Sequence, residues 1–243
     1  VKILGKLKPE NSLAQLIKLA EDKHFDVRES VAETLGNFEI EAVESTLISL
    51  LEDKIGDVRK KAAISLLESH PDKAIPVFKS LLKDEDLYIR EETAETIGEL
   101  KLEAAIPELI PLLKDKYGNV RYQAVEALRS LNAKSAIPEL IPLLKDECDE
   151  VATVTAKALS ELQAEEVGPT LVNLLESNDM FVKQSSLQAL AQIKSDKAMI
   201  ELNQLLQNKK FMQLDNGIHY SHALDLLREI QTELGYYRPV SGK

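Results

Sequence analysis

The sequence predicts an all-α fold, an α-solenoid of about seven antiparallel helix pairs with a 31-residue repeat. Three observations predict it. Apolar residues recur in columns one period apart, prolines and aspartates recur at the same interval, and the composition favours helices. Leu, Ala, Glu, Lys and Ile dominate the 243 residues, while aromatic residues make up only 5% and Trp is absent.

Two sets of apolar columns define the period. A column that opens at Val27 is followed, eight residues later, by one that opens at Leu35, and small residues such as Ala32 lie between them. The members of the first column are Val27, Val58, Ile89, Val120, Val151 and Val182. A further column consists of Leu19, Leu50, Leu81, Leu112, Leu143, Leu174 and Leu205. So many columns in one register indicate a true repeat.

The first helix of each repeat, helix A, is best defined in the fourth repeat. Pro107 is expected to begin it, because proline suits the first helical turn, where its missing N–H would have no partner. The apolar face consists of Leu109, Ile110, Leu112 and Leu113. Residues 115–119, which include Gly118, are expected to form a turn.

The second helix, helix B, follows that turn. Asn119 is expected to be its N-cap, as are Asp26 and Asp57 in earlier repeats. Its apolar stripe consists of Val120, Ala124, Leu128 and Leu131. One helix pair cannot bury its apolar face alone, so stability has to come from stacked neighbours, which the small residues of helix B allow to approach closely.

At these residues the sequence resembles the HEAT-repeat family. That family has a proline in helix A, an aspartate eight positions later and a Val-Arg pair that opens helix B, a pattern matched by Pro107, Asp115, Val120 and Arg121. The short period resembles the subclass known from phycobilin lyases. The resemblance implies a polar ladder between an aspartate of one repeat and an arginine of a neighbour. Its members would be Asp22, Asp53, Asp84 and Asp115 with Arg28, Arg59, Arg90 and Arg121.

We expect this ladder to weaken in later repeats, where Ala152 and Lys183 replace arginine and Ser177 replaces aspartate. One solenoid is expected over residues 1–243. Its parts are the end of a truncated preceding repeat (1–10), regular repeats (11–205), a modified last repeat (206–235) and a tail (236–243). Six residues are inserted around 208–217, and this insertion is either a binding loop or part of an adapted cap.

The charge of the chain restricts its partners. Asp and Glu outnumber Lys and Arg by 41 to 30, for a net charge of −11, which repels phosphate backbones and anionic headgroups. Nucleic acid and membrane surfaces are therefore not expected as partners. Cys148 is the only cysteine and cannot form an internal disulfide, which favours a reducing compartment and a cytoplasmic location.

Catalytic motifs are not found in the sequence. It contains no glycine-rich phosphate loop, nucleophile elbow or paired-cysteine motif. His219 and His222 lie three residues apart, but zinc usually takes three or four protein ligands. We therefore expect no catalytic residue, no bound metal and no cofactor.

The resemblance implies that the B helices line the concave side of the array, so their exposed residues would form one surface. The predicted surface residues are Glu29, Glu33, Lys60, Ile64, Glu91, Glu95, Tyr122 and Glu126. Its N-terminal half is acidic, and Ile64 and Tyr122 are apolar anchor candidates. These features favour a non-catalytic protein–protein interaction scaffold that binds a basic or mixed-charge segment. The alternative, implied only by the subclass, is a bilin lyase or chromophore-handling protein, for which bilin would be the ligand.

Overall fold

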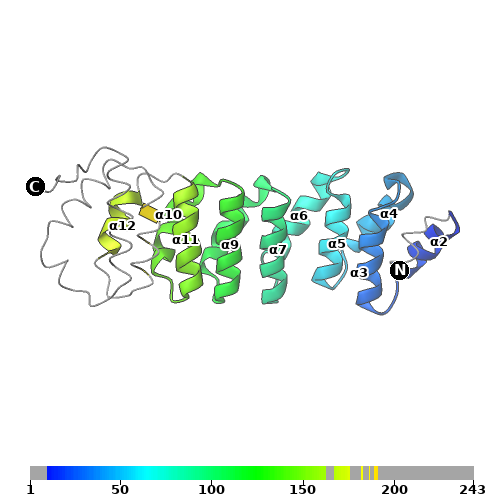
Figure 1. The fold of residues 1–243 in the computed structure, drawn as a ribbon. Coiled ribbons are helices and arrows are strands. Elements are labelled where there is room, and N and C mark those ends of the chain that lie inside the picture. The colour runs from blue at the N-terminus through cyan, green and yellow to red at the C-terminus, as the bar shows by residue number, and fades with distance from the viewer. Residues whose placement is uncertain (1–9, 163–166, 176–181, 183–185, 187–188, 191–243) are drawn as a thin grey trace, which may run out of the picture. The chain divides into compact units, whose positions relative to one another are not determined.

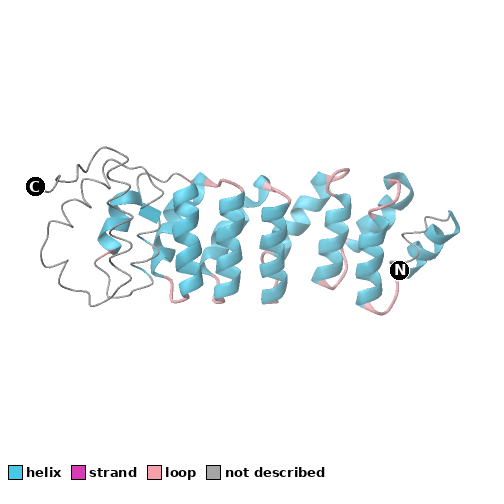
Figure 2. Cartoon of the chain, viewed as in Figure 1, coloured by secondary structure: helices cyan, strands magenta, loops and turns pink. Residues whose placement is uncertain are grey.

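The computed structural model describes residues 10–162, 167–175, 182, 186 and 189–190, and every regular element in this part of the chain is a helix (Figures 1 and 2). The chain divides into two compact units, Val1–Leu112 and Leu113–Lys243, which are described separately. The predictions for 206–235 and for 236–243 lie outside the described residues, as does nearly all of the segment 1–10.

The first unit alternates A and B helices in the predicted order (Figure 1). The A helices are α2 (Glu10–Leu19), α4 (Ile40–Leu50) and α6 (Pro71–Leu81), and the B helices are α3 (Phe25–Leu35), α5 (Gly56–Leu66) and α7 (Leu87–Glu99). Helix α5 contacts both neighbouring B helices, α3 and α7, and also the A helices α4 and α6. The stack thus buries the apolar faces that a single pair would leave in water.

The fourth A segment is not the single helix that the apolar face predicts. It begins with the 3-10 helix η1 (Glu103–Ala105), continues as α8 (Ile106–Leu109) and ends as the 3-10 helix η2 (Ile110–Lys114). Pro107 lies in the first turn of α8, and Pro111 follows four residues later. Pro111 has no N–H to donate and its ring clashes with the carbonyl four residues before it, so the α-helix stops there.

The second unit repeats this arrangement. Helix α9 (Gly118–Ser130) is a B helix, and the A segment after it consists of η3 (Lys134–Ala136), α10 (Ile137–Leu140) and η4 (Ile141–Lys145). Here Pro142 follows Pro138 at the same four-residue spacing. Helix α11 (Asp149–Glu161), the next B helix, packs against α9 and η4, and α12 (Gly168–Leu174) is the next A helix.

The repeated columns form the core. Two of them are fully buried in every described repeat, one on each helix of the pair. On the A helices these residues are Leu16, Leu47, Phe78, Leu109, Leu140 and Leu171, and on the B helices Leu35, Leu66, Ile97, Leu128, Leu159 and Leu190. The small residues Ala32, Ala63 and Ala94 are also fully buried, which fits close approach of adjacent B helices.

The turns between A and B helices show that the predicted N-caps are wrong. Helices α3, α5 and α9 begin one residue before Asp26, Asp57 and Asn119, which therefore lie in the first turn. The repeated aspartate organises the turn instead, through an Oδ1 that accepts a hydrogen bond from the backbone N–H two residues later. These aspartates are Asp22, Asp53, Asp84, Asp115 and Asp146, with N···O distances of 2.8 to 3.0 Å.

Gly56, the first residue of α5, is held against α7. A Cβ at this position would lie 3.0 Å from Cδ1 of Ile89 and 3.1 Å from both of its γ carbons. Gly56→Ala should therefore destabilise the protein by about 1–2 kcal/mol through overpacking, although alanine is the better helix former. Urea denaturation measures the change, and Gly56→Ala combined with Ile89→Ala should cost less than the sum of the single changes. A higher urea midpoint for Gly56→Ala would contradict this packing.

Candidate binding surface

The repeated arginines join adjacent repeats. Arg28 donates from Nε and Nη2 to the carboxylate of Asp53, at 2.6 and 2.9 Å, and from Nη1 to the backbone carbonyl of Asp22, at 2.7 Å. Its carboxylate partner thus lies one repeat further on, while the aspartate of its own repeat supplies a carbonyl. The hydrogen bond from Arg28 is the main cause that holds the pKa of Asp53 below its ordinary value.

Other arginines of the series follow the same plan. Arg121 donates from Nε and Nη2 to Asp146, at 2.8 and 2.6 Å, and from Nη1 to the carbonyl of Asp115, at 2.7 Å. Arg90 donates from Nη1 to the carbonyls of Asp84 and Glu85. Ala152 occupies the next arginine position and is buried, while the remaining substitutions expected to weaken the ladder, at Ser177 and Lys183, lie outside the described residues.

Arg59 makes a looser connection than Arg28. A single hydrogen bond of 3.0 Å joins it to Asp84, and the two side chains are 20% and 24% exposed. The side chains of Arg28 and Asp53 are only 8% and 9% exposed. Since solvent screens an exposed pair, Arg59 contributes less to the stack than Arg28 does.

We define the B-helix face of the first unit as the exposed and half-buried side of α3, α5 and α7. Glu33 and Glu95 are exposed there, and Glu29, Ile64 and Glu91 are half-buried. Five of the predicted surface residues are thus accessible on this face.

Lys60 corrects the prediction, because its side chain is buried and not free for a partner. The residue is only 5% exposed, and its ammonium group forms ion pairs with Glu92 of α7 and with Asp57, the latter at 3.2 Å. Burial lowers the pKa of Lys60, but the two carboxylates outweigh burial and leave the pKa raised. Lys60 therefore stays charged and joins α5 to α7.

Negative charge dominates this face. Its carboxylates are Asp26, Glu29, Glu33, Asp57, Glu91, Glu92, Glu95 and Glu99, and its ammonium groups are Lys60 and Lys61. The pKa of Glu29 is raised, first by burial and then by the nearby charge of Asp57. A cationic partner at this position would offset that repulsion.

On the second unit, the two B helices α9 and α11 form a groove of about 520 Å³. The predicted surface residues Tyr122 and Glu126 line it from α9. The lining from α11 consists of Asp149, Glu150, Thr153, Val154 and Lys157. The structure therefore places Tyr122 and Glu126 together at one hollow.

Glu126 also takes part in an ion-pair network that was not predicted from the sequence. Arg129 donates to Glu126 at 2.6 Å and to Glu161 of α11 at 2.6 Å. The ion pair between Arg129 and Glu161 joins residues 32 positions apart, which is one period plus one residue. The ion pair between Lys60 and Glu92 has the same spacing. A search for basic residues followed by acidic residues at that spacing would have indicated both.

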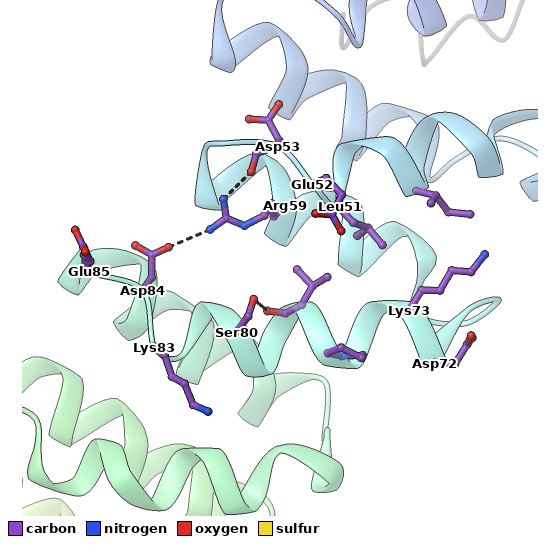
Figure 3. Close-up of a pocket in the computed structure, with 13 residues that line it drawn as sticks. Leu51, Glu52, Asp53, Arg59, Asp72, Lys73, Ser80, Lys83, Asp84 and Glu85 are labelled. Atoms are coloured by element: carbon purple, nitrogen blue, oxygen red, sulfur yellow. Dashed lines mark hydrogen bonds and ion pairs between the residues drawn. The ribbon is translucent and has the colours of Figure 1, made fainter.

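A larger hollow lies on the A-helix side of the first unit (Figure 3). We call it the A-helix groove, with a volume of about 990 Å³. Its apolar lining consists of Ile48 and Leu51 from the α4 segment and Pro76 and Val77 from α6. Charged residues stand at both ends of α6, with Asp72 and Lys73 at one end and Asp84 and Glu85 at the other (Figure 3). This groove was not predicted from the sequence.

Comparison with known families decides the fold class. The sequence profile described as HEAT repeats matches residues 1–68, 44–129, 106–191 and 137–211. The chain belongs to the HEAT-repeat family. Together with the helices described above, this match confirms the predicted α-solenoid fold class.

Solved structures support the same fold for this HEAT-repeat chain. YibA of Escherichia coli is 24% identical with a TM-score of 0.61, over 93% of this chain and 84% of that chain. An engineered protein is 20% identical with a TM-score of 0.56, over 92% of this chain and 68% of that chain. The complex of CpcE and CpcF of phycocyanin lyase from Nostoc is 25% identical over 90% of this chain and 94% of that chain, but its TM-score of 0.49 is too low to transfer a function. No curated protein matches the sequence.

Metal binding and membrane spanning can be judged for the described residues of the HEAT-repeat chain. No group of three or more His, Cys, Asp and Glu side chains there is arranged to hold a metal ion. His219 and His222 lie outside that part of the chain. Each described helix is too short or too polar for a membrane span.

The Cys148 thiol donates a hydrogen bond to a nearby carboxylate. Its Sγ lies 3.0 Å from Oε2 of Glu150, and this hydrogen bond is the main cause that raises the pKa of the thiol. Since the thiolate is the reactive form, alkylation by iodoacetamide at pH 8 should be slow. Glu150→Gln removes the carboxylate, so the pH midpoint of alkylation should move down and the rate at pH 8 should rise. The matched change Glu147→Gln should leave both unchanged, and an unchanged midpoint in Glu150→Gln would argue against the contact.

Proposed function

We propose that this HEAT-repeat chain is a non-catalytic protein–protein interaction scaffold that binds a basic or mixed-charge partner segment on the B-helix face of its first unit. The observation that carries the proposal is the excess of carboxylates on α3, α5 and α7. Of the two lysines on this face, Lys60 is already bound to Glu92 and Asp57. The face therefore offers negative charge that its own cations do not neutralise.

The geometry favours an extended or helical peptide over a small molecule as the partner. The acidic residues are spread over the three helices α3, α5 and α7. Glu33 on α3 and Glu95 on α7 are exposed, and the half-buried Ile64 lies on α5, between these two helices. Acidic side chains spread over a surface attract a basic segment and increase its association rate. This attraction depends little on the exact geometry of any single ion pair. The half-buried Ile64 adds an apolar contact that can hold the segment once it has arrived.

The first test is to identify the partner. Extract from the native source is passed over the immobilised chain, and retained material is identified by mass spectrometry and absorbance. We expect a protein that moderate salt elutes, since salt screens exposed charges. A synthetic peptide of its most basic segment should bind the purified chain, with an affinity that falls as salt is raised.

The same experiment addresses the chromophore-handling alternative. Retained bilin, or a shift in bilin absorbance on mixing with the purified chain, would support that alternative and count against the scaffold. A scaffold of this kind needs no cofactor and no metal, and we propose a cytoplasmic location for it on the basis of the single cysteine.

A further inference from the structure

We infer that the A-helix groove of the first unit is a second docking site, which takes an amphipathic helical segment of a partner with lysine or arginine at both ends and apolar residues between them. The site is separate from the B-helix face because none of the acidic residues of that face lines the groove. Four observations support it, namely the size of the groove, its apolar floor, the charges at its ends and the loose connection at its wall.

The groove is large and its floor is apolar. Its volume of about 990 Å³ lies at the upper end of the range of about 300–1,000 Å³ for ligand pockets. Leu51 is buried at its base, Ile48 and Val77 are half-buried, and Pro76 is exposed. Apolar side chains of a partner would cover these residues and remove them from water.

The ends of the groove are acidic. Among the residues that the structure describes, Glu52, Asp72 and Glu85 line the groove without an ion-pair partner, against a single unpaired cation, Lys83. Lys73 is bound to Glu44 at 3.5 Å. The net negative rim favours a basic occupant, and it disfavours a second copy of this chain, whose own net charge is −11.

The length of α6 sets the spacing of the basic residues in the partner. Asp72 lies near the start of α6 and Glu85 beyond its end, and the eleven residues of the helix span about 16 Å. A helical partner that lies along α6 would place its basic residues roughly 11 to 13 positions apart to meet both ends. Apolar residues at i, i+3, i+4 and i+7 between them would form the face that enters the groove.

The wall of the groove contains the looser of the two ladder connections. Arg59 and Asp84 line it and form the looser ladder connection, with a single hydrogen bond of 3.0 Å. The ladder connection beside the groove is therefore weaker than the one between Arg28 and Asp53 one repeat earlier.

The serines of α4 and α6 provide a matched test. Ser49 and Ser80 occupy the same column one period apart, both are exposed, and each donates from Oγ to a backbone carbonyl three residues earlier at 2.8 Å. Only Ser80 lines the groove. Ser80→Trp should therefore fill the groove, and Ser49→Trp should place the same indole outside it.

The probe is a fluorescein-labelled helical peptide of 14 residues with leucines at i, i+3, i+4 and i+7 and lysines at both ends, titrated with the full chain at low salt. A second peptide carries glutamates at the ends. We expect the lysine peptide to bind about tenfold more tightly than the glutamate peptide. Ser80→Trp should weaken binding of the lysine peptide by about tenfold, and Ser49→Trp by less than about twofold.

The controls separate this site from the B-helix face. Circular dichroism and the thermal midpoint establish that both tryptophan variants are folded. In a chain that also carries Glu91→Lys and Glu95→Lys, which alter the B-helix face, Ser80→Trp should still weaken binding of the lysine peptide about tenfold more than Ser49→Trp does. Equal effects of the two tryptophan changes, or loss of binding only in the B-helix variant, would overturn the groove site. The second of these results would leave the proposed function standing.

Discussion

Arg28→Met is expected to destabilise the protein by about 3 kcal/mol, because it leaves a buried carboxylate without its cation. The side chains of Arg28 and Asp53 are 8% and 9% exposed and share two hydrogen bonds. Without Arg28, the backbone N–H of Ile55 remains as a donor to the Asp53 carboxylate. The free energy of unfolding from urea denaturation, followed by circular dichroism, measures the loss.

Arg59→Met is the matched control. It removes the same guanidinium from the next repeat, where one hydrogen bond joins two side chains that are 20% and 24% exposed. The expected cost is about 1 kcal/mol or less. Equal costs for the two changes would mean that burial does not determine how strongly the ladder holds neighbouring repeats.

The contribution of Arg28 should depend on pH in one direction. The pKa of Asp53 is lowered in the folded state, so the pair stabilises the protein fully above the ordinary aspartate pKa of about 4. This stabilisation is lost as the pH falls through the lowered pKa. The difference between the wild-type chain and Arg28→Met should therefore shrink below about pH 4.

Phe78→Ala is expected to cost about 3–5 kcal/mol, since Phe78 is fully buried and its removal leaves a cavity. The other residues of this column are all leucines, namely Leu16, Leu47, Leu109, Leu140, Leu171 and Leu202. Phe78→Leu restores the residue of the column and should cost about 1 kcal/mol. Urea denaturation of both variants tests this, and similar large costs would show that the core of the third repeat is packed unlike its neighbours.

The period made the fold predictable, because each column falls on the same side of its helix in every repeat. In the described repeats the A-helix column from Leu16 to Leu171 and the small residues Ala32, Ala63 and Ala94 of the B helices are fully buried, as the pattern requires. The helix starts were missed at Asp26, Asp57 and Asn119, since all three are good N-cap residues that lie in the first turn instead. The repeated aspartate sets these turns through a hydrogen bond two residues on, which residue preference alone does not indicate.

The candidate surfaces were predictable only in part. Helical register predicts that Glu33 and Glu95 lie on the exposed side, and both are exposed. Register does not show which partner the terminal group of a long side chain reaches. Lys60 bends to Glu92 of the adjacent helix and is buried, although its position faces outward. The A-helix groove depends on the spacing between two helices of different repeats, which no local sequence pattern records.

The central claim, that the acidic B-helix face binds a basic partner, is tested most directly by a matched pair of charge reversals. Glu91→Lys with Glu95→Lys changes two residues of α7, and Glu41→Lys with Glu103→Lys changes two exposed acidic residues on the A-helix side of the same unit. Both variants alter the net charge equally. The measurement is the affinity of each for the partner segment captured by the wild-type chain. Our account predicts a loss of about tenfold or more for the α7 variant and little change for the other. Equal losses in both variants, or full binding by the α7 variant, would contradict it.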